Sequence, residues 1–274
     1  MLTICIILIV LLVLDLLFTL ALRCRKGHRK WEVLKKYRYA HRGYHDKPVV
    51  PENSLPAFRR AIERGFGAEL DVHLLKDGTL AVFHDSDLKR CANVEGEIED
   101  LTLDELKQLR LEGTDEQIPT FDEVLALFEH ETPLIIELKT ARGNHKALAK
   151  AVCERLDSYQ GEFCIESFDP FALIDVKKLR PEICRGQLSM NFEKDKAGLP
   201  WYKRFIAGNL LLNFLTVPDF IAYKFEDRSS YCLRSCVRVW GAQEVDWTIR
   251  TKEDMLDCEA AGGIPIFERF DPEA

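Results

Sequence analysis

The sequence has no excess of positive charge, and its cysteines follow no recognisable metal-binding or redox spacing. Lys and Arg total 38 against 45 Asp and Glu, which gives a net charge of −7. Because a nucleic-acid-binding domain is expected to present a basic surface, we exclude nucleic acid as the main partner. The 9 cysteines contain no C-x-x-C pair and no zinc-type spacing with histidine. Scattered thiols of this kind indicate a reducing compartment rather than a disulfide framework.

A Gly-x-Gly-x-x-Gly turn is also missing after the first predicted strand, which disfavours a doubly wound dinucleotide-binding sheet. Short apolar runs instead alternate with amphipathic helical patterns along most of the 274 residues. Strands that alternate with helices predict a parallel sheet. Because about eight such units follow one another, we predict the α/β class and a (β/α)₈ TIM barrel.

The expected strands cover residues 37–41, 68–74, 80–83, 133–139, 163–167, 183–188, 220–225, 245–249 and 263–268. The expected helices cover residues 55–64, 101–109, 121–128, 145–156, 170–179, 231–238 and 253–261. Thr102 and Thr120 precede two of these helices and are predicted N-caps, because a threonine oxygen can accept a bond from the first free amides.

The N-terminus carries one long apolar run over residues 2–22, interrupted by a single charged residue, Asp15. About 20 apolar residues are enough to cross a bilayer as a helix. No Lys or Arg precedes the run and no small-residue cleavage site follows it, which disfavours a cleaved signal peptide. A buried core helix is disfavoured as well, because the run offers no polar face.

Basic residues are concentrated directly after this run, between Arg23 and Arg38. By the positive-inside rule, this cluster places the following domain on the cytoplasmic side, and it can also contact anionic headgroups. We therefore predict a single-pass membrane protein. It comprises a transmembrane anchor over residues 1–23, a basic juxtamembrane linker over 24–36 and a cytoplasmic barrel domain over 37–274.

Chemically active side chains cluster at the ends of the predicted strands, where barrels carry their active sites. Alternate residues of a strand point to the same face, so Glu69 and Asp71 share one direction, as do Glu137 and Lys139. The candidates at these ends are His41, Arg42, Glu69, Asp71, His84, Glu137, Lys139 and Trp247.

Three of these candidates are carboxylates that would converge inside the barrel. Carboxylates in a low-dielectric interior repel one another unless a cation joins them. Oxygen ligands suit Mg²⁺ or Ca²⁺, so we predict a divalent metal cation at Glu69, Asp71 and Glu137. Positive charge from Arg42 and Lys139 beside that metal suits a phosphate ester.

The histidines complete this set, since His41 and His84 at separate strand ends can act as general acid and base. Each piece also has a simpler interpretation, such as a surface turn or a solvated strand face. We interpret His73 as a solvated neighbour that the pattern does not need, His45 as a loop-surface residue, and the cysteines as core residues. These simpler interpretations do not account for the joint occurrence of the set in this order.

The joint pattern resembles the glycerophosphodiester phosphodiesterase family over most of residues 38–270. The matching stretches are AHRGY, PENSLPAF, GAELDVHLLKDGTLAVFHD, LKRCANVEGEIEDLTLDEL, IPTFDEVL, LIIELK, ESFDP and WTI. The resemblance implies a TIM barrel with a small insertion after the second strand. It also implies hydrolysis of glycerophosphodiesters to glycerol 3-phosphate and an alcohol with a divalent cation.

Carried over by position, the resemblance implies an acid/base pair of His41 and His84, whose individual roles stay open. It implies metal ligands at Glu69, Asp71 and Glu137 and phosphate ligands at Arg42 and Lys139. Glu52 would lie near the metal, and Trp247 would form an aromatic wall. Two stretches depart from the family pattern: residues 91–93, Cys-Ala-Asn, and the last strand, GGIPIFERFDP, which contains none of the carried-over residues.

Residues 198–217 form an extra apolar segment. We hypothesise that it touches the bilayer and helps to admit a lipid-derived or lysolipid substrate. A buried amphipathic helix on the barrel wall is the alternative.

Three other functions stay open at this point. The first is phospholipase-D-like hydrolysis of lysophospholipids at the membrane. The second is a catalytically inactive membrane scaffold, which the intact set of site residues disfavours. The third is an aldolase or isomerase with a Schiff-base lysine; Lys139 is disfavoured for it, because a metal carboxylate two residues away indicates an ion-paired ammonium.

Overall fold

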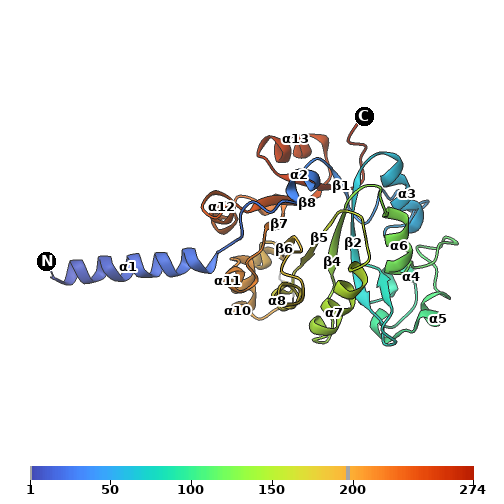
Figure 1. Ribbon diagram of the computed structural model, residues 1–274, viewed down its shortest axis with the longest axis horizontal. Helices are drawn as coiled ribbons and strands as arrows, with labels where there is room; N and C mark the ends of the chain where they lie inside the picture. The colour runs from blue at the N-terminus through green and yellow to red at the C-terminus, as the bar shows by residue number, and fades with distance from the viewer. Residues whose placement is uncertain (1, 196–197) are drawn as a thin grey trace.

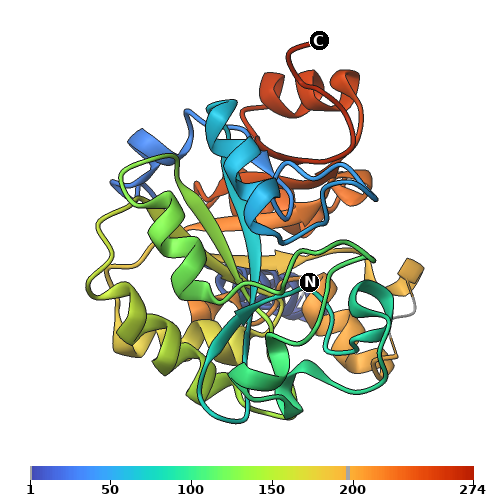
Figure 2. The same cartoon turned by 90° about the vertical axis from the view of Figure 1, so that its right-hand side faces the viewer.

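The computed structural model describes residues 2–195 and 198–274, and its strands close into a barrel (Figures 1 and 2). The sheet order is β1-β9-β8-β7-β6-β5-β4-β2-β3, and β1 also pairs with β2, which closes the ring. Every pairing in that ring is parallel, whereas β3 pairs antiparallel with β2 outside it. The predicted (β/α)₈ barrel is therefore confirmed, and the segment that carries β3 is the insertion after the second strand.

The strands are β1 Tyr39–Ala40, β2 Gly67–Leu74, β3 Leu80–Val82, β4 Leu134–Leu138, β5 Phe163–Ser167, β6 Arg185–Ser189, β7 Phe220–Lys224, β8 Gln243–Ile249 and β9 Ile264–Phe267. The helices before β4 are α1 Leu2–Ala21, α2 Trp31–Leu34, α3 Leu55–Glu63, α4 Lys89–Ala92, η1 Ile98–Asp100, α5 Leu103–Leu106 and α6 Phe121–Phe128. Those after β4 are α7 His145–Leu156, α8 Pro170–Leu179, α9 Phe192–Asp195, α10 Trp201–Gly208, α11 Asn213–Thr216, η2 Phe225–Asp227, α12 Tyr231–Arg238 and α13 Lys252–Ala260.

Local sequence signals explain several of these helix boundaries. The side chains of Thr102 and Thr120 accept bonds from the amides of Glu105 and Glu123, and both glutamates bond back to the threonine amides. Both sites are therefore capping boxes, as expected at helix N-termini. The predicted helix over residues 101–109 is shorter than expected, because only Leu103–Leu106 is helical.

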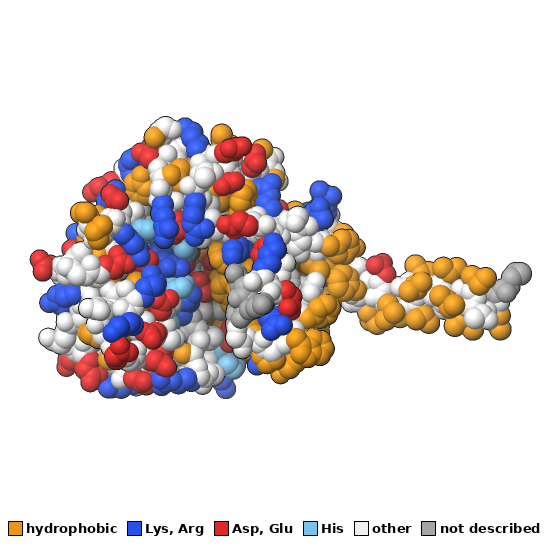
Figure 3. All heavy atoms as spheres, turned by 180° about the vertical axis from the view of Figure 1, so that it is seen from behind, with side chains coloured by type: hydrophobic (Ala, Val, Ile, Leu, Met, Phe, Trp, Pro, Cys, Tyr) orange, Lys and Arg blue, Asp and Glu red, His pale blue; other side chains and the backbone are white. Residues whose placement is uncertain are grey.

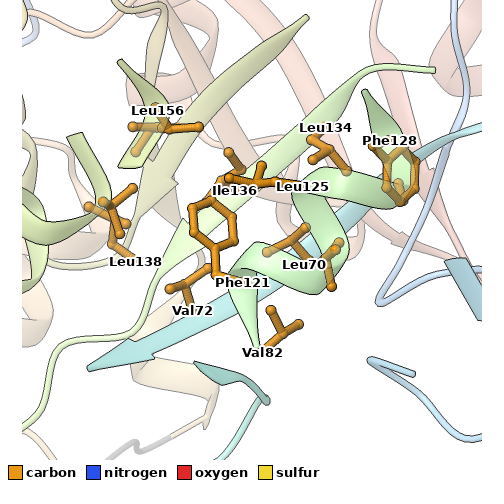
Figure 4. Packing of buried hydrophobic residues seen from close by; sticks show 14 of the residues in the cluster. Leu70, Val72, Val82, Phe121, Leu125, Phe128, Leu134, Ile136, Leu138 and Leu156 are labelled. Atoms are coloured by element: carbon orange, nitrogen blue, oxygen red, sulfur yellow. The ribbon is translucent and has the colours of Figure 1, made fainter. Parts of the chain in front are cut away.

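Two apolar layers hold the barrel together. Inside it, apolar residues from most of the parallel strands pack with Trp31 and Leu34 of α2, which close the end where the strands begin. Outside it, the helices pack on the strand faces that point away from the axis, as Figure 4 shows for α6 and α7 against β2 and β4. Eight of the nine cysteines are buried, as predicted, and Cys5 alone is exposed.

The helix α1 projects away from the barrel and contacts it only near its C-terminal end (Figure 1). It is 20 residues long, carries no buried residue in its apolar window, and is long and apolar enough to cross a membrane. The basic segment that follows lies against the base of the barrel. There Arg25 forms an ion pair with Asp219, with Nη2 2.7 Å from Oδ2, and donates to the carbonyl of Pro181.

Candidate active site

A cavity of about 220 Å³ opens at the carboxyl ends of the barrel strands. It is smaller than the sites that enclose drug-sized ligands, so it suits a small polar group. Figure 3 shows the hollow with histidine and basic side chains at its mouth. Its lining includes His41, Arg42, Glu52, Glu69, His84, Arg90, Glu137, Glu166, Phe168, Trp247, Arg250 and Glu268.

Three buried carboxylates converge at this end of the barrel. One oxygen each of Glu69, Asp71 and Glu137 lies within 4.8 Å of the others. They meet because β2 and β4 pair in parallel with Asp71 opposite Glu137, and because Glu69 lies two residues before Asp71 on the same strand face.

The electrostatics of the three carboxylates favour a bound cation. Burial raises the pKa of Glu69 well above its ordinary value, and the charges of Asp71 and Glu137 raise it further. Burial also raises the pKa of Glu137. Such an oxygen-only donor set, desolvated and mutually repelling, fits a divalent cation such as Mg²⁺ or Ca²⁺.

A fourth carboxylate, Glu166, lies beside this group and is missing from our sequence-based candidates. It sits on β5 directly opposite Glu137 of β4. Its pKa is raised well above the ordinary value by burial, and by the charges of Glu137 and Asp71. Among the described residues its Oε2 has no hydrogen-bond partner. The sequence did carry a signal for Glu166: it lies two residues after Cys164 on an apolar strand, so both side chains point to the same face of the sheet.

Lys139 lies in the same cluster and remains an ammonium. Its Nζ is 3.0 Å from Oε1 of Glu137 and 3.3 Å from Oδ1 of Asp71. Burial alone would lower the pKa of Lys139, but these two carboxylates outweigh it and the pKa is raised. A raised pKa disfavours the free amine that Schiff-base chemistry needs, so Lys139 does not suit the aldolase or isomerase alternative.

The turn between β1 and α3 positions both a cation and one of the three clustered carboxylates. Arg42 has a left-handed φ of 55°, and its amide donates to Oε2 of Glu69 at 3.0 Å. Gly43 follows with φ 79°, and a Cβ there would lie 2.9 Å from the backbone of Ala57, so only glycine fits. Asn53, a further residue that the sequence did not single out, donates from Nδ2 to Oδ2 of Asp71 at 2.8 Å.

Glu52 holds two guanidinium groups at the mouth of the cavity. Its Oε1 accepts from Nη1 of Arg42 at 2.8 Å and from Nη2 of Arg90 at 2.7 Å. Lys47 also forms an ion pair with it. Burial alone would raise the pKa of Glu52, but these cations outweigh it and the pKa is lowered. Glu52 therefore contacts cations and lies outside the group of Glu69, Asp71 and Glu137.

His41 is held by a carboxylate from the last strand. Its Nδ1 lies 2.7 Å from Oε2 of Glu268, while its Nε2 lies 3.9 Å from Oε2 of Glu69 and so faces the carboxylate cluster. Burial, together with the charge of Arg42, lowers the pKa of His41 to about 4. Glu268 was not among our candidates, although it belongs to the departing stretch GGIPIFERFDP.

His45 also lies at this carboxylate, with Nε2 3.7 Å from Oε2 of Glu268. The interpretation of His45 as a loop-surface residue is therefore wrong. Its side chain is buried, because the turn that follows β1 folds back over the end of β9.

His84 is held by the residue that follows it. Its Nδ1 lies 2.5 Å from Oδ1 of Asp85, and Oδ2 of Asp85 accepts from Nε of Arg90. Burial alone would raise the pKa of Asp85, but these two partners outweigh it and the pKa is lowered. Each candidate catalytic histidine thus has its own carboxylate partner.

The interpretation of His73 as a solvated neighbour is wrong. Its side chain is buried, with Nδ1 2.6 Å from Oε1 of Glu99 and Nε2 3.2 Å from the carbonyl oxygen of His84. The insertion packs over β2 and covers it. His73 therefore supports the turn that presents His84.

An aromatic wall closes one side of the cavity. Trp247, near the end of β8, packs edge to face against the ring of Phe168, with ring centroids 5.6 Å apart. The structure thus brings every sequence-predicted site residue to one end of the barrel, with Lys139 in contact with both Asp71 and the lining residue Glu137.

Comparison with known proteins agrees with this geometry. Residues 41–267 match the profile of the Glycerophosphoryl diester phosphodiesterase family. The chain is 34% identical over 237 residues to a glycerophosphodiester phosphodiesterase of Caldanaerobacter subterraneus subsp. tengcongensis, with 81% of this chain and 89% of that protein covered.

Two further proteins show different aspects of the likeness. The structure of an Oleispira antarctica phosphodiesterase in complex with the product sn-glycerol-3-phosphate has a TM-score of 0.69 and 26% identity, covering 85% of this chain and 92% of that one. A lysophospholipase D of Rattus norvegicus is 35% identical over 124 residues, which is 40% of this chain and 38% of that protein.

Proposed function

Because the chain belongs to the glycerophosphoryl diester phosphodiesterase family and is a glycerophosphodiester phosphodiesterase, we propose that it hydrolyses its substrates with a divalent cation and two histidines. The products are glycerol 3-phosphate and an alcohol. The observation that carries the proposal is the convergence of Glu69, Asp71 and Glu137 at the cavity that His41 and His84 also line.

Glu69, Asp71 and Glu137 are the proposed metal ligands, and Glu166 lies close enough in the strand register to support them. When bound, Mg²⁺ or Ca²⁺ supplies a Lewis acid for the phosphate oxygens. The amide of Asn53 orients Asp71, and the amide of Arg42 orients Glu69. Each of these hydrogen bonds uses only part of the acceptor capacity of its carboxylate, so oxygen lone pairs are left to bind the metal.

The substrate phosphate is bound by Arg42 and Lys139 in this proposal. Both cations are partly buried and fixed, Arg42 by Glu52 and Lys139 by Glu137. Charge-assisted bonds from fixed donors are stronger than those from mobile surface side chains. Arg90, the second guanidinium on Glu52, adds positive charge at the mouth.

The two histidines move the protons. One accepts a proton from a water molecule as its oxygen bonds to phosphorus, and the other donates a proton to the alcohol oxygen as its bond to phosphorus breaks, so the charge of the phosphate is unchanged over the step. Glu268 keeps Nε2 of His41 directed toward the carboxylate cluster, and Asp85 fixes the ring of His84. Trp247 and Phe168 offer an apolar wall to the carbon atoms of the substrate.

We further propose that the enzyme is a single-pass membrane protein with its barrel in the cytoplasm. The anchor covers residues 1–23, the basic segment 24–36 and the barrel domain 37–274. The length and apolar surface of α1 support the anchor. The exposed side chains of Arg23, Lys26 and Arg29, directly after it, support the orientation.

Phospholipase-D-like hydrolysis of lysophospholipids is the second candidate. The likeness to a lysophospholipase D over 124 residues favours it, as does the apolar helix that would place the barrel beside lipid. An inactive scaffold is disfavoured, because a buried carboxylate cluster with raised pKa values is costly to keep without a function.

The test is release of glycerol 3-phosphate from glycerophosphocholine by the full chain in detergent, with and without a chelator. The full chain is used because Leu22 and Arg25 pack into the barrel. We expect release that the chelator stops and that His41→Ala and Glu69→Ala each reduce at least about 100-fold. His145→Ala is the matched control, because His145 also pairs with an aspartate, Asp175, but on the helical layer.

Each outcome separates the candidates. Release that survives Glu69→Ala would refute the metal assignment while keeping the reaction. Choline release from lysophosphatidylcholine in vesicles, without activity on glycerophosphocholine, would favour the second candidate. No activity on either substrate would favour the scaffold.

A further inference from the structure

We propose that α10, α11 and the start of α12 form a face of the barrel that rests in the headgroup layer of the membrane. This lipid-facing surface consists of Trp201, Tyr202, Phe205, Phe214, Leu215 and Tyr231. The proposal rests on the proposed insertion of α1, and it does not depend on the phosphodiesterase activity.

The surface is unusual in composition and exposure. Trp201 is 71% exposed, Phe205 53% and Tyr231 64%, and all six side chains count as exposed. Elsewhere on the described barrel, the exposed large apolar side chains are Val49, Leu103, Phe171, Leu179, Val239 and Leu256, of which only Phe171 is aromatic. Contiguous apolar patches of this kind mark interaction sites rather than ordinary surface.

The surface lies around the point where α1 leaves the barrel. The ring of Phe18 stacks on Tyr231 with centroids 6.2 Å apart, and the indole N–H of Trp240 donates to the carbonyl of Thr19 at 3.0 Å. Leu22 is fully buried among residues of α12 and β7 and the segment before α11. Figure 1 shows α10, α11 and α12 on the side from which α1 projects, and Figure 3 shows hydrophobic side chains at the base of that helix.

The length of α1 sets the depth of this surface. Its 20 residues span about 30 Å at a rise of roughly 1.5 Å per residue, which is about the thickness of the hydrocarbon core. The last turn is already docked on the barrel, so no spacer separates the barrel from the membrane. The residues around Phe18 and Leu22 therefore lie at the level of the headgroups when α1 spans the bilayer.

The chemistry of the surface matches that level. Trp and Tyr are enriched where a membrane meets water, because one part of each ring is apolar and the other polar. Exposed basic side chains on the same helices, namely Lys203, Arg234 and Arg238, add attraction for anionic headgroups. The partner is therefore the lipid bilayer that α1 crosses.

The same segment reaches the cavity. Phe192 of α9, just before α10, packs edge to face on Phe168 at 6.1 Å, and Phe168 in turn contacts Trp247 of the aromatic wall. Aromatic contacts thus connect α9, which packs against α10, to the aromatic wall of the site.

The test measures contact between Trp201 and lipid in the full chain, reconstituted into vesicles of phosphatidylcholine and phosphatidylserine. Brominated acyl chains quench tryptophan emission at short range. The chain has 4 tryptophans, so the difference in quenching between the wild type and Trp201→Phe reports on Trp201. We expect this substitution to lower the quenched fraction of the emission roughly twofold, because Trp201 is the most exposed and lies in the interface.

A matched control places a tryptophan on the far side of the barrel. Leu103→Trp in the Trp201→Phe background adds a ring on α5, which lies at the end of the molecule opposite α1 (Figure 1). The emission that this added tryptophan contributes should stay unquenched. Carbonate extraction of the same vesicles reports separately whether α1 is inserted.

Two results would overturn the proposal. One is an inserted protein whose quenching is the same with and without Trp201, or equally strong at position 103. The other is a protein that carbonate extracts, which removes the premise while leaving the release of glycerol 3-phosphate unaffected. A dimer in sedimentation that buries Trp201 would likewise replace lipid with a second copy as the occupant.

Discussion

Glu268→Gln tests whether a carboxylate on the last strand sets the chemistry of His41. The substitution keeps the shape of the side chain and removes its charge. In the structure Oε2 of Glu268 lies 2.7 Å from Nδ1 of His41, and Oε1 accepts from Nε of Arg250 at 2.9 Å. Burial alone would raise the pKa of Glu268, but the bond from His41 and the nearby His45 outweigh it and the pKa is lowered, so the native acceptor is charged.

The expected magnitude follows from the change of acceptor. A hydrogen bond to an ionised group contributes about 1.5–3 kcal/mol, against about 0.5–1.5 kcal/mol for a neutral pair. The loss of roughly 1–1.5 kcal/mol corresponds to about a tenfold lower rate at 1.36 kcal/mol per decade. The amide can also present its N–H to Nδ1 and reverse the tautomer, so we expect kcat to fall about 10- to 100-fold.

The assay is steady-state release of glycerol 3-phosphate from glycerophosphocholine, with kcat and KM determined separately. KM should change little, because Glu268 contacts His41 rather than the proposed phosphate ligands. Arg250→Met is the matched control, since it removes the second partner of the same carboxylate and should change kcat less than about threefold. A wild-type kcat in Glu268→Gln, or a higher KM with kcat unchanged, would refute the positioning role.

Two further predictions concern buried carboxylates. Glu166→Gln should weaken binding of Mg²⁺ or Ca²⁺ to the substrate-free protein about 10- to 100-fold, measured by calorimetry. Glu162→Gln, which changes a carboxylate at the other end of β5, should leave the metal affinity unchanged. If Glu166→Gln binds the metal as tightly as the wild type does, Glu166 is not part of the metal site. Burial raises the pKa of Asp246 to about 6, so ionisation of this carboxyl is less favourable in the folded than in the unfolded state. The free energy of unfolding therefore decreases as the pH rises from the pKa of the unfolded chain to about 6. Asp246→Asn should therefore gain up to about 3 kcal/mol over wild type at pH 8 and little at pH 4 in thermal unfolding; an equal gain at both pH values would contradict this.

Local sequence patterns were enough to predict the strands, the longer helices and part of the site. The alternation of charged and apolar residues in β2 and β4 predicts which side chains share the interior face, because strand geometry has a period of two. The capping residues Thr102 and Thr120 act on amides three positions away, so they too were readable from the sequence. The carboxylates Glu69 and Asp71 followed from the same reasoning.

The partners of these groups depend on closure of the barrel. Glu268 meets His41 across 227 residues, because β9 pairs with β1. Glu166 reaches Glu137 only through the register of β5 against β4. His73 is buried by an insertion whose docking no local pattern reports.

The sequence by itself thus determined the strands, the longer helices of the barrel and most of the residues that carry charge into it, since those follow from short-range periodicity; the short helices α2, α4, α9 and α11 were not predicted. Only the tertiary structure decided which carboxylate orients which histidine, and which helices share a face with α1. These relations join segments that are distant in the chain, and the packing of the whole barrel sets their distances.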